Sequence, residues 1–231
     1  MRSPYFILSY LPVSLAPTYG PCHKRAPEFL LDVTLPGHSL IQAPCERLLP
    51  LTDASRLAVV ARPSHIKSIS FQLPDLVPDN LFCEPGPKDS MSAIGLAATI
   101  VAQRDPDAVI GSSQLTTLSL ALMRSFSAVS EAVLVAQKGY LVTIGIAPRP
   151  PSTGFGYVRL GDGLGMPDAP NARLVSSFKE IPDARTVAAY IATGSYRWNA
   201  GMFVTKVSFL MDLLREYKPE LAEGLTRIAA I

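Results

Sequence analysis

Short runs of β-branched residues that alternate with longer segments of helical periodicity restrict the fold of this chain more than any other feature. The runs lie at residues 6–9, 56–61, 80–83, 108–111 and 140–146. Such alternation is typical of a parallel sheet whose strands are joined by crossover helices. We therefore expect a doubly wound α/β layer.

The segments between these runs repeat apolar residues at the spacing of a helix face. One segment carries Met91, Ile94, Ala98 and Val101, and a second carries Leu118, Leu122, Phe126, Val129 and Val133. A third helix is expected to begin near Asp183 and to stop at Gly194. Two more are expected from the apolar residues of 207–217 and 221–228.

The character of the chain changes after Ile146, where Pro148, Pro150 and Pro151 precede a glycine-rich segment. We expect the sheet to gain antiparallel strands here and so to become mixed. The length of 231 residues, with 48% apolar and 17% charged residues, is sufficient for one substantial core. A single domain over residues 1–231 is therefore expected.

The charge of the chain and the spacing of its cysteines and histidines argue against a nucleic-acid partner, a disulfide framework and a zinc site. The net charge is +2 and the basic residues are scattered, so no stripe that would follow a nucleic-acid backbone is present. The three cysteines and three histidines are far apart, which supports neither a disulfide framework nor a zinc site. We expect a small-molecule partner.

The apolar run at residues 5–16 has two readings. It resembles a signal peptide, but Pro12 interrupts it, and Arg2 is the one basic residue before it. The run is also too short to cross a bilayer. We expect a buried first strand, no membrane partner and a cytoplasmic protein.

Two short motifs combine residues suited to a sugar. Thr153-Gly154-Phe155-Gly156-Tyr157 places two glycines where a ligand could approach the backbone of a strand, although, taken alone, so short a pattern more often marks a bulge or tight turn. Trp198-Asn199-Ala200-Gly201-Met202-Phe203 offers an amide that can donate to and accept from a hydroxyl. Glu180, between the motifs, could accept from two hydroxyls or be a solvated surface carboxylate.

The order and spacing of these motifs resemble the mannose-1-phosphate guanylyltransferases of the sugar-nucleotidyltransferase family. The resemblance covers most of residues 29–231 and implies a Rossmann-like fold in GDP-mannose biosynthesis. It implies transfer of GMP from GTP to mannose 1-phosphate with Mg²⁺, giving GDP-mannose and pyrophosphate, and leaves a homo-oligomer open. The sugar-binding residues implied are Gly154, Gly156, Tyr157, Glu180, Asn199 and Gly201.

The same resemblance divides the domain into a divergent nucleotide-loop region at 1–28, a nucleotide half at 29–147 and a sugar-phosphate half at 148–231. It also implies that the chain stops short of the family's C-terminal part. The nucleotide-binding residues implied are Glu84, Pro85, Lys88, Asp89 and Ser90, which precede a predicted helix. The N-terminus of that helix could bind an anion, or Asp89 or Ser90 could simply cap it.

Departures from the family pattern predict impaired catalysis. Residues 12–18 lack the glycines and the arginine of the family's triphosphate loop, and proline offers no N–H to a phosphate. Thr116 occupies the position of the metal-binding aspartate, and Ile181 that of the lysine that meets the sugar phosphate. We expect no intact catalytic residue and no intact metal site. The alternative function is a catalytically silent sugar-nucleotide-binding or regulatory subunit, a pseudoenzyme.

Overall fold

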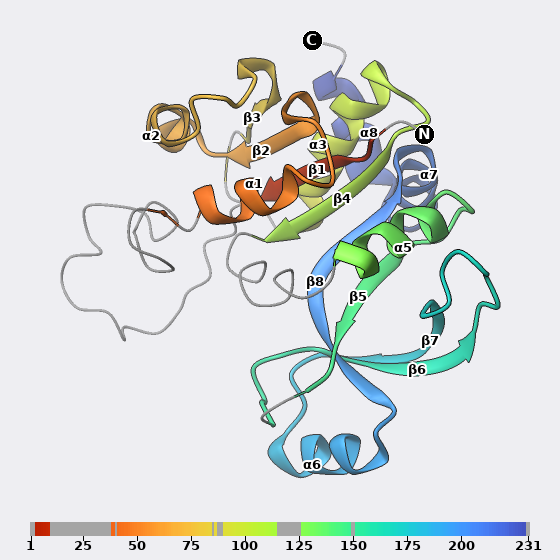
Figure 1. Cartoon of the computed structure of the whole chain (residues 1–231). Helices are drawn as coiled ribbons and strands as arrows, with labels where there is room; N and C mark the ends of the chain where they lie inside the picture. The colour runs from red at the N-terminus through yellow and green to blue at the C-terminus, as the bar shows by residue number, and fades with distance from the viewer. Residues whose placement is uncertain are drawn as a thin grey trace.

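The computed structural model describes residues 3–9, 38–39, 41–84, 86, 90–114, 126–148 and 151–229. Within them, eight strands form one mixed sheet in the order β3-β2-β1-β4-β8-β6-β7, and β5 pairs with β8 (Figure 1). The strands are β1 Tyr5–Ser9, β2 Leu57–Ala61, β3 Leu81–Cys83, β4 Val109–Gln114, β5 Val142–Ile146, β6 Tyr157–Gly163, β7 Arg173–Lys179 and β8 Tyr196–Lys206. The expected mixed, doubly wound α/β fold is confirmed.

The parallel part of the sheet is buried on both faces. Strand β1 pairs in parallel with β2 and β4, and β2 pairs in parallel with β3. Phe6 and Leu8 point into one core and Tyr5 and Ile7 into the other, as the two-residue period of a strand requires. This explains why these strands read as continuous apolar runs.

Helices cover the two faces of the sheet in separate sets. One core is closed by α1 Gln42–Leu48, α2 Ile66–Gln72 and α5 Phe126–Ala136. The opposite core is closed by α3 Ser90–Arg104, α7 Val207–Tyr217 and α8 Pro219–Ala229. The remaining elements are α6 Ala184–Thr193 and three 3₁₀ turns, η3 Ala54–Arg56, η4 Pro63–His65 and η5 Pro78–Asn80. Of the predicted helix at 118–133, the part before residue 126 lies outside the described residues.

Strand β8 joins the two parts of the sheet. Its C-terminal half pairs antiparallel with β4, through Val109↔Lys206 to Ser112↔Phe203, and its N-terminal half pairs antiparallel with β6. Strand β5 lies along β8 with an irregular register, and β6 forms an antiparallel hairpin with β7. The antiparallel strands expected after Ile146 are confirmed.

Helix α6 begins and ends where the sequence predicts. The carboxylate of Asp183 accepts from the main-chain N–H of Thr186 at 2.8 Å, which caps the helix. Gly194 adopts a left-handed φ of 67° at its end. Tyr190 of this helix stacks on Tyr196 at 3.7 Å between ring centroids and so holds α6 against β8.

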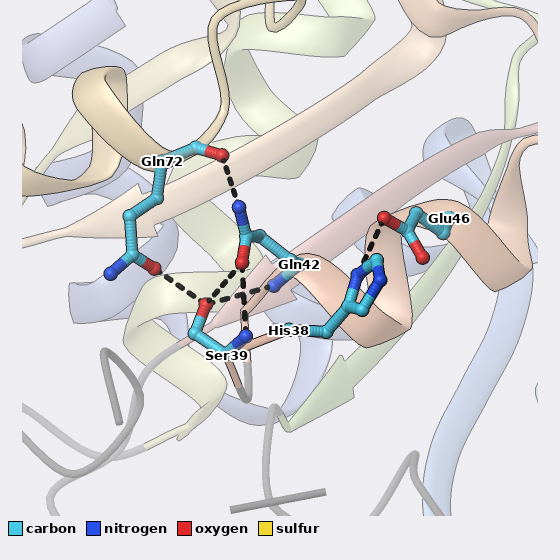
Figure 2. A network of polar contacts seen from close by, with 5 residues as sticks. All are labelled: His38, Ser39, Gln42, Glu46 and Gln72. Carbon is cyan, nitrogen blue, oxygen red and sulfur yellow. Dashed lines mark hydrogen bonds and ion pairs between the residues drawn. The ribbon is translucent and has the colours of Figure 1, made fainter. Parts of the chain in front are cut away.

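A polar network fixes the start of α1 against α2 (Figure 2). The main-chain N–H of Ser39 donates to Oε1 of Gln42 at 2.9 Å, and Nε2 of Gln42 donates to the main-chain oxygen of Gln72 at 3.0 Å. One turn further along, Nδ1 of His38 lies 2.9 Å from Oε1 of Glu46. Because Ser39 and Gln42 bond reciprocally, the pair resembles a capping box.

In the described part of the chain, no helix is long and apolar enough to cross a membrane.

Candidate functional site

Gly156, Glu180 and Asn199, which are far apart in sequence, are in direct contact. The main-chain N–H of Asn199 donates to the main-chain oxygen of Gly156 at 2.8 Å. A Cβ atom added to Gly156 would lie 3.2 Å from Oε2 and 3.3 Å from Oε1 of Glu180. Glycine therefore allows the carboxylate to rest against the backbone, where a side chain would displace it.

The side chain of Asn199 has a defined orientation. Its Oδ1 accepts from the hydroxyl of Thr143 at 2.6 Å and from the main-chain N–H of Gly201 at 3.2 Å. Since a main-chain N–H can only donate, the second bond identifies this atom as the oxygen. The amide nitrogen remains as the group with which Asn199 could meet a ligand, so Asn199 would act as a donor.

Gly201 creates the irregularity that places Asn199. Its φ of 66° lies in the left-handed region that favours glycine. The pairing of β5 with β8 shifts on either side of it, from Thr143↔Phe203 to Gly145↔Asn199. The predicted site residues Asn199 and Gly201 thus act together at a bulge, a device that redirects a side chain from a sheet.

Tyr157 lies behind the site rather than on its surface. Its side chain is fully buried, and its hydroxyl donates to the main-chain oxygen of Ser152 at 2.8 Å and accepts from Nε1 of Trp198 at 2.8 Å. Phe155 packs on Trp198 with ring centroids 4.8 Å apart. Tyr157 and Trp198 therefore support the loop, and any ligand contact of Tyr157 would involve its backbone.

The two glycines of the first motif lie in a loop, which agrees with the bulge or tight turn that the sequence allowed and not with the strand. Strand β6 begins at Tyr157, after both of them. The main-chain N–H of Gly154 donates to Oγ of Ser152 at 3.2 Å, a local bond that bends the chain before the strand begins. The turn that the sequence left as an alternative is the structure observed, and it also holds Gly156 against Glu180.

Ile181, directly after Glu180, has an unusual backbone. Its φ is 39°, which is rare for a β-branched residue, and its side chain is 70% exposed. Lys179 is the last residue of β7 and is exposed. The turn at Ile181 therefore directs the chain out of the sheet immediately beyond the carboxylate that contacts Gly156.

The predicted nucleotide-binding residues are described in part. Glu84 is buried at the end of β3, and its main-chain N–H donates to the main-chain oxygen of Ala61 at 3.0 Å. Ser90 is the first residue of α3. Pro85, Lys88 and Asp89 lie outside the described residues, as does the loop at 12–18.

The described donors do not fit the magnesium ion implied by the resemblance. In that part of the chain, no three His, Cys, Asp or Glu side chains lie close enough to hold a metal. Thr116, at the expected aspartate position, lies outside the described residues, and a neutral hydroxyl is a poor replacement for a carboxylate ligand of so hard a cation.

An open cleft of about 470 Å³ lies between α5, β5 and the β6–β7 hairpin. Its lining includes Glu131, Ile144, Leu174 and Arg197, and none of the six predicted sugar-binding residues belongs to it. Glu131 accepts from the main-chain N–H and the side-chain amide of Asn171, another lining residue, at 3.0 and 2.8 Å. The cleft is therefore a separate feature of the same half of the chain.

Two residues of the site were missed by sequence reasoning. Thr143 orients Asn199, and Ser152 shapes the loop that carries Gly154 and Gly156. Neither lies in a recognisable motif. The proximity of Ser152 to a glycine two positions later was the one local signal, since serine often bonds the backbone at that spacing.

Comparisons with known proteins agree with this architecture. A family model described as nucleotidyl transferase matches residues 24–230. The chain is 34% identical over 193 residues to the xanthan biosynthesis protein XanB of Xanthomonas campestris pv. campestris strain B100, covering 81% of this chain and 39% of that protein. It is 31% identical over 173 residues to the mannose-1-phosphate guanylyltransferase of Escherichia coli strain K12, covering 72% and 36%. The chain thus spans less than two fifths of the length of these relatives.

Solved structures show the same fold. A structure described as mannose-1-phosphate geranyltransferase from Thermus thermophilus has a TM-score of 0.77 at 22% identity, covering 100% of this chain and 65% of that one. One described as mannose-6-phosphate isomerase from Helicobacter pylori has a TM-score of 0.75 at 22% identity, covering 99% and 80%.

Proposed function

The chain belongs to the nucleotidyl transferase family, and on that premise we propose that it is a mannose-1-phosphate guanylyltransferase-like protein with impaired activity. The reaction joins the phosphate oxygen of mannose 1-phosphate to the α-phosphorus of GTP, releases pyrophosphate and leaves GDP-mannose. Relatives named for this activity, at 31% identity in the case of the Escherichia coli protein, support the choice of substrates.

One observation carries the proposal: the contact of Gly156, Glu180 and Asn199 in a single cluster. Their groups complement a polyhydroxylated ring, because the Glu180 carboxylate accepts from hydroxyls and the Asn199 amide nitrogen donates to one. The absent side chain at Gly156 leaves the backbone open to close approach. We assign the sugar to these three residues and to Gly154 and Gly201 beside them.

Impaired turnover follows from the residues that would meet the phosphates. The reaction develops charge at the α-phosphorus and on the leaving pyrophosphate, which positive groups must stabilise. If the missing loop arginine and the missing carboxylate ligand at Thr116 each cost roughly 3 kcal/mol of this stabilisation, the rate falls about four orders of magnitude. At the lysine position, the exposed and apolar Ile181 adds no charge.

Turnover and binding measurements test this proposal together. Purified protein with GTP, mannose 1-phosphate and Mg²⁺ should release pyrophosphate at a rate near background, whereas calorimetry should show saturable binding of mannose 1-phosphate or GDP-mannose. Robust pyrophosphate release would contradict the impairment. Failure of both sugar ligands to bind would remove the proposal itself.

The alternative is a catalytically silent subunit that binds a sugar nucleotide and acts on a partner. The exposed apolar side chains Leu174, Val175 and Phe178 on the edge strand β7 favour it, because they offer a surface for another protein chain. Binding of GDP-mannose with no turnover at any Mg²⁺ concentration is the result that this alternative predicts. We also propose a cytoplasmic location and a homo-oligomer.

A further inference from the structure

Phe71 on α2 projects into solvent. Among the large apolar side chains in the described part of the chain it is the most exposed, at 87%. On the same helix, Ile69 is buried in the core and Gln72 accepts through Oε1 from the hydroxyl of Ser39 (Figure 2), so Phe71 is left on the outer face. A single exposed apolar residue is common on protein surfaces, and Phe71 becomes informative through the pocket beside it.

An open pocket of about 250 Å³ lies between α1, α2 and the segment that follows α2. Its apolar lining includes Cys45, Leu57, Leu73 and Leu76. Burial raises the pKa of the Cys45 thiol to about 12, so this group is uncharged at neutral pH and acts as a small apolar side chain. Since an apolar cavity of about 150 Å³ can hold benzene, this pocket has room for one phenyl ring.

The exposed ring and the pocket adjoin on one surface. Gln72 and Leu73, the two residues that follow Phe71, line the pocket, whereas Phe71 itself does not. A surface that carries both a projecting ring and a pocket for a ring is complementary to itself. A twofold rotation can bring the ring of each copy to the pocket of the other, as an isologous interface requires.

Two charges of opposite sign follow the same symmetry. Lys67 lies four residues before Phe71, a spacing that places both on one face of α2, and both are exposed. Asp75 lines the pocket and is exposed. Within the described residues, neither Lys67 nor Asp75 forms an ion pair, whereas the other acidic lining residue, Glu46, pairs with His38. The rotation that brings Phe71 to the pocket would bring Lys67 toward Asp75 of the partner subunit.

We propose that Lys67, Phe71 and the pocket between α1 and α2 form a homodimer interface, in which Phe71 of each subunit enters the pocket of the other. A second copy of this chain is the occupant because the ring, its pocket and both charges lie on one surface. Aromatic residues are enriched in such interfaces. The inference rests on the homo-oligomer of the proposed function and gives it an interface.

The proposed interface is separate from the sugar cluster. Helix α2 lies near β2 and β3, at one end of the sheet, whereas Gly156, Glu180 and Asn199 belong to the part around β6, β7 and β8 (Figure 1). Dimerisation and sugar binding can therefore be measured independently of one another.

Sedimentation equilibrium tests the interface from both of its sides. The wild-type protein should dimerise with a dissociation constant in the micromolar range, and Phe71→Ala should weaken dimerisation at least about 30-fold, the loss expected for an interface anchor. Ala54→Trp adds a large ring at an exposed residue that lines the pocket, so it should block entry and weaken dimerisation similarly. Phe178→Ala, which removes an exposed phenylalanine from β7, is the matched control and should leave the dissociation constant unchanged.

A mixture of the two variants distinguishes reciprocal insertion from a general loss of apolar surface. Phe71→Ala keeps an open pocket and Ala54→Trp keeps the ring, so one of the two contacts can form between them. With one variant fluorescently labelled, the mixed pair should associate about tenfold more tightly than either variant does with itself.

Unchanged dimerisation in Phe71→Ala, or a mixture that associates no better than its components, overturns this inference alone. A wild-type protein that is monomeric at every concentration overturns it together with the proposed homo-oligomer. Calorimetry with mannose 1-phosphate should give the same affinity for Phe71→Ala as for the wild type, which also shows that the variant is folded. Failure of both proteins to bind this ligand would remove the sugar assignment and leave the interface to the sedimentation result.

Discussion

The main-chain N–H of Asn199 donates to the main-chain oxygen of Gly156 at 2.8 Å. This bond joins the glycine motif at residues 153–157 to the Trp-Asn motif at residues 198–203. Glu180 reaches the same place from the end of β7, where its carboxylate rests against the α-carbon of Gly156. Sequence order alone indicated a common role for these residues, and the sheet supplies the contact between them.

Substitution of Gly156 by alanine should weaken sugar binding. The added Cβ would lie 3.2 Å from Oε2 of Glu180, so the carboxylate must move. Loss of its hydrogen bonds to a ligand should cost about 1.5 kcal/mol, or roughly tenfold in affinity for mannose 1-phosphate measured by calorimetry. Gly163→Ala is the matched control, because nothing lies within 4 Å of the Cβ it would gain. Equal affinities for the two variants would contradict the role of Glu180.

Two substitutions of Asn199 should separate support of the fold from contact with the ligand. Asn199→Asp keeps an oxygen for Thr143 and Gly201 and removes the amide donor, so stability should change little while sugar affinity falls. Asn199→Ala loses both bonds and should lower the free energy of unfolding by about 1–2 kcal/mol. Urea titration and calorimetry together measure the two effects. Loss of stability in Asn199→Asp equal to that in Asn199→Ala would refute the separation.

Relief of the backbone at Ile181 should stabilise the protein. A β-branched residue is strained at its φ of 39°, and asparagine tolerates this region better. Ile181→Asn should raise the free energy of unfolding by about 1 kcal/mol, whereas Ile181→Val, which keeps the branch, should leave it unchanged. Thermal unfolding of both variants measures the difference. A stabilisation shared by the two would assign the effect to the loss of exposed apolar surface instead.

Acid should destabilise helix α6 by protonating Asp183, the residue that caps its start. The main-chain and side-chain hydrogen bonds from Thr186 lower the pKa of Asp183 below its usual value of 3.8. Because this pKa is lower in the folded protein than in the unfolded chain, ionised Asp183 stabilises the fold above pH 3.8. This stabilisation is lost as the pH falls through the pKa of Asp183 in the folded state. Asp183→Asn keeps an acceptor without titrating there, so the helical circular dichroism of this variant should change less between about pH 5 and pH 2. An identical acid response in both proteins would show that another group is responsible.

Much of the fold was predictable from the sequence, for reasons visible in particular elements. The strand at 56–61 was found because β2 is buried on both faces and so is apolar throughout. The bounds of α6 were found because Asp183 and Gly194 are local capping signals. For Gly154 and Gly156 the sequence allowed a strand or a turn, and the structure has the turn, in which the main-chain N–H of Gly154 donates to Oγ of Ser152.

The arrangement of the candidate site was predictable in part. The motifs identified Gly156, Glu180 and Asn199. Thr143 was not identified, because it contacts Asn199 only where β5 pairs with a bulge in β8. Contacts between strands depend on register, which no single segment encodes.

The position of β8 also has a consequence for how the chain is made. Strand β4 ends at Gln114, and the part of β8 that pairs with it begins at Phe203. Nearly ninety more residues must therefore be synthesised before β8 can cover this edge of β4. During synthesis, the parallel strands would present an open, apolar edge for several seconds at ordinary rates of translation. Nascent chains that pause in this interval should be the ones that chaperones capture.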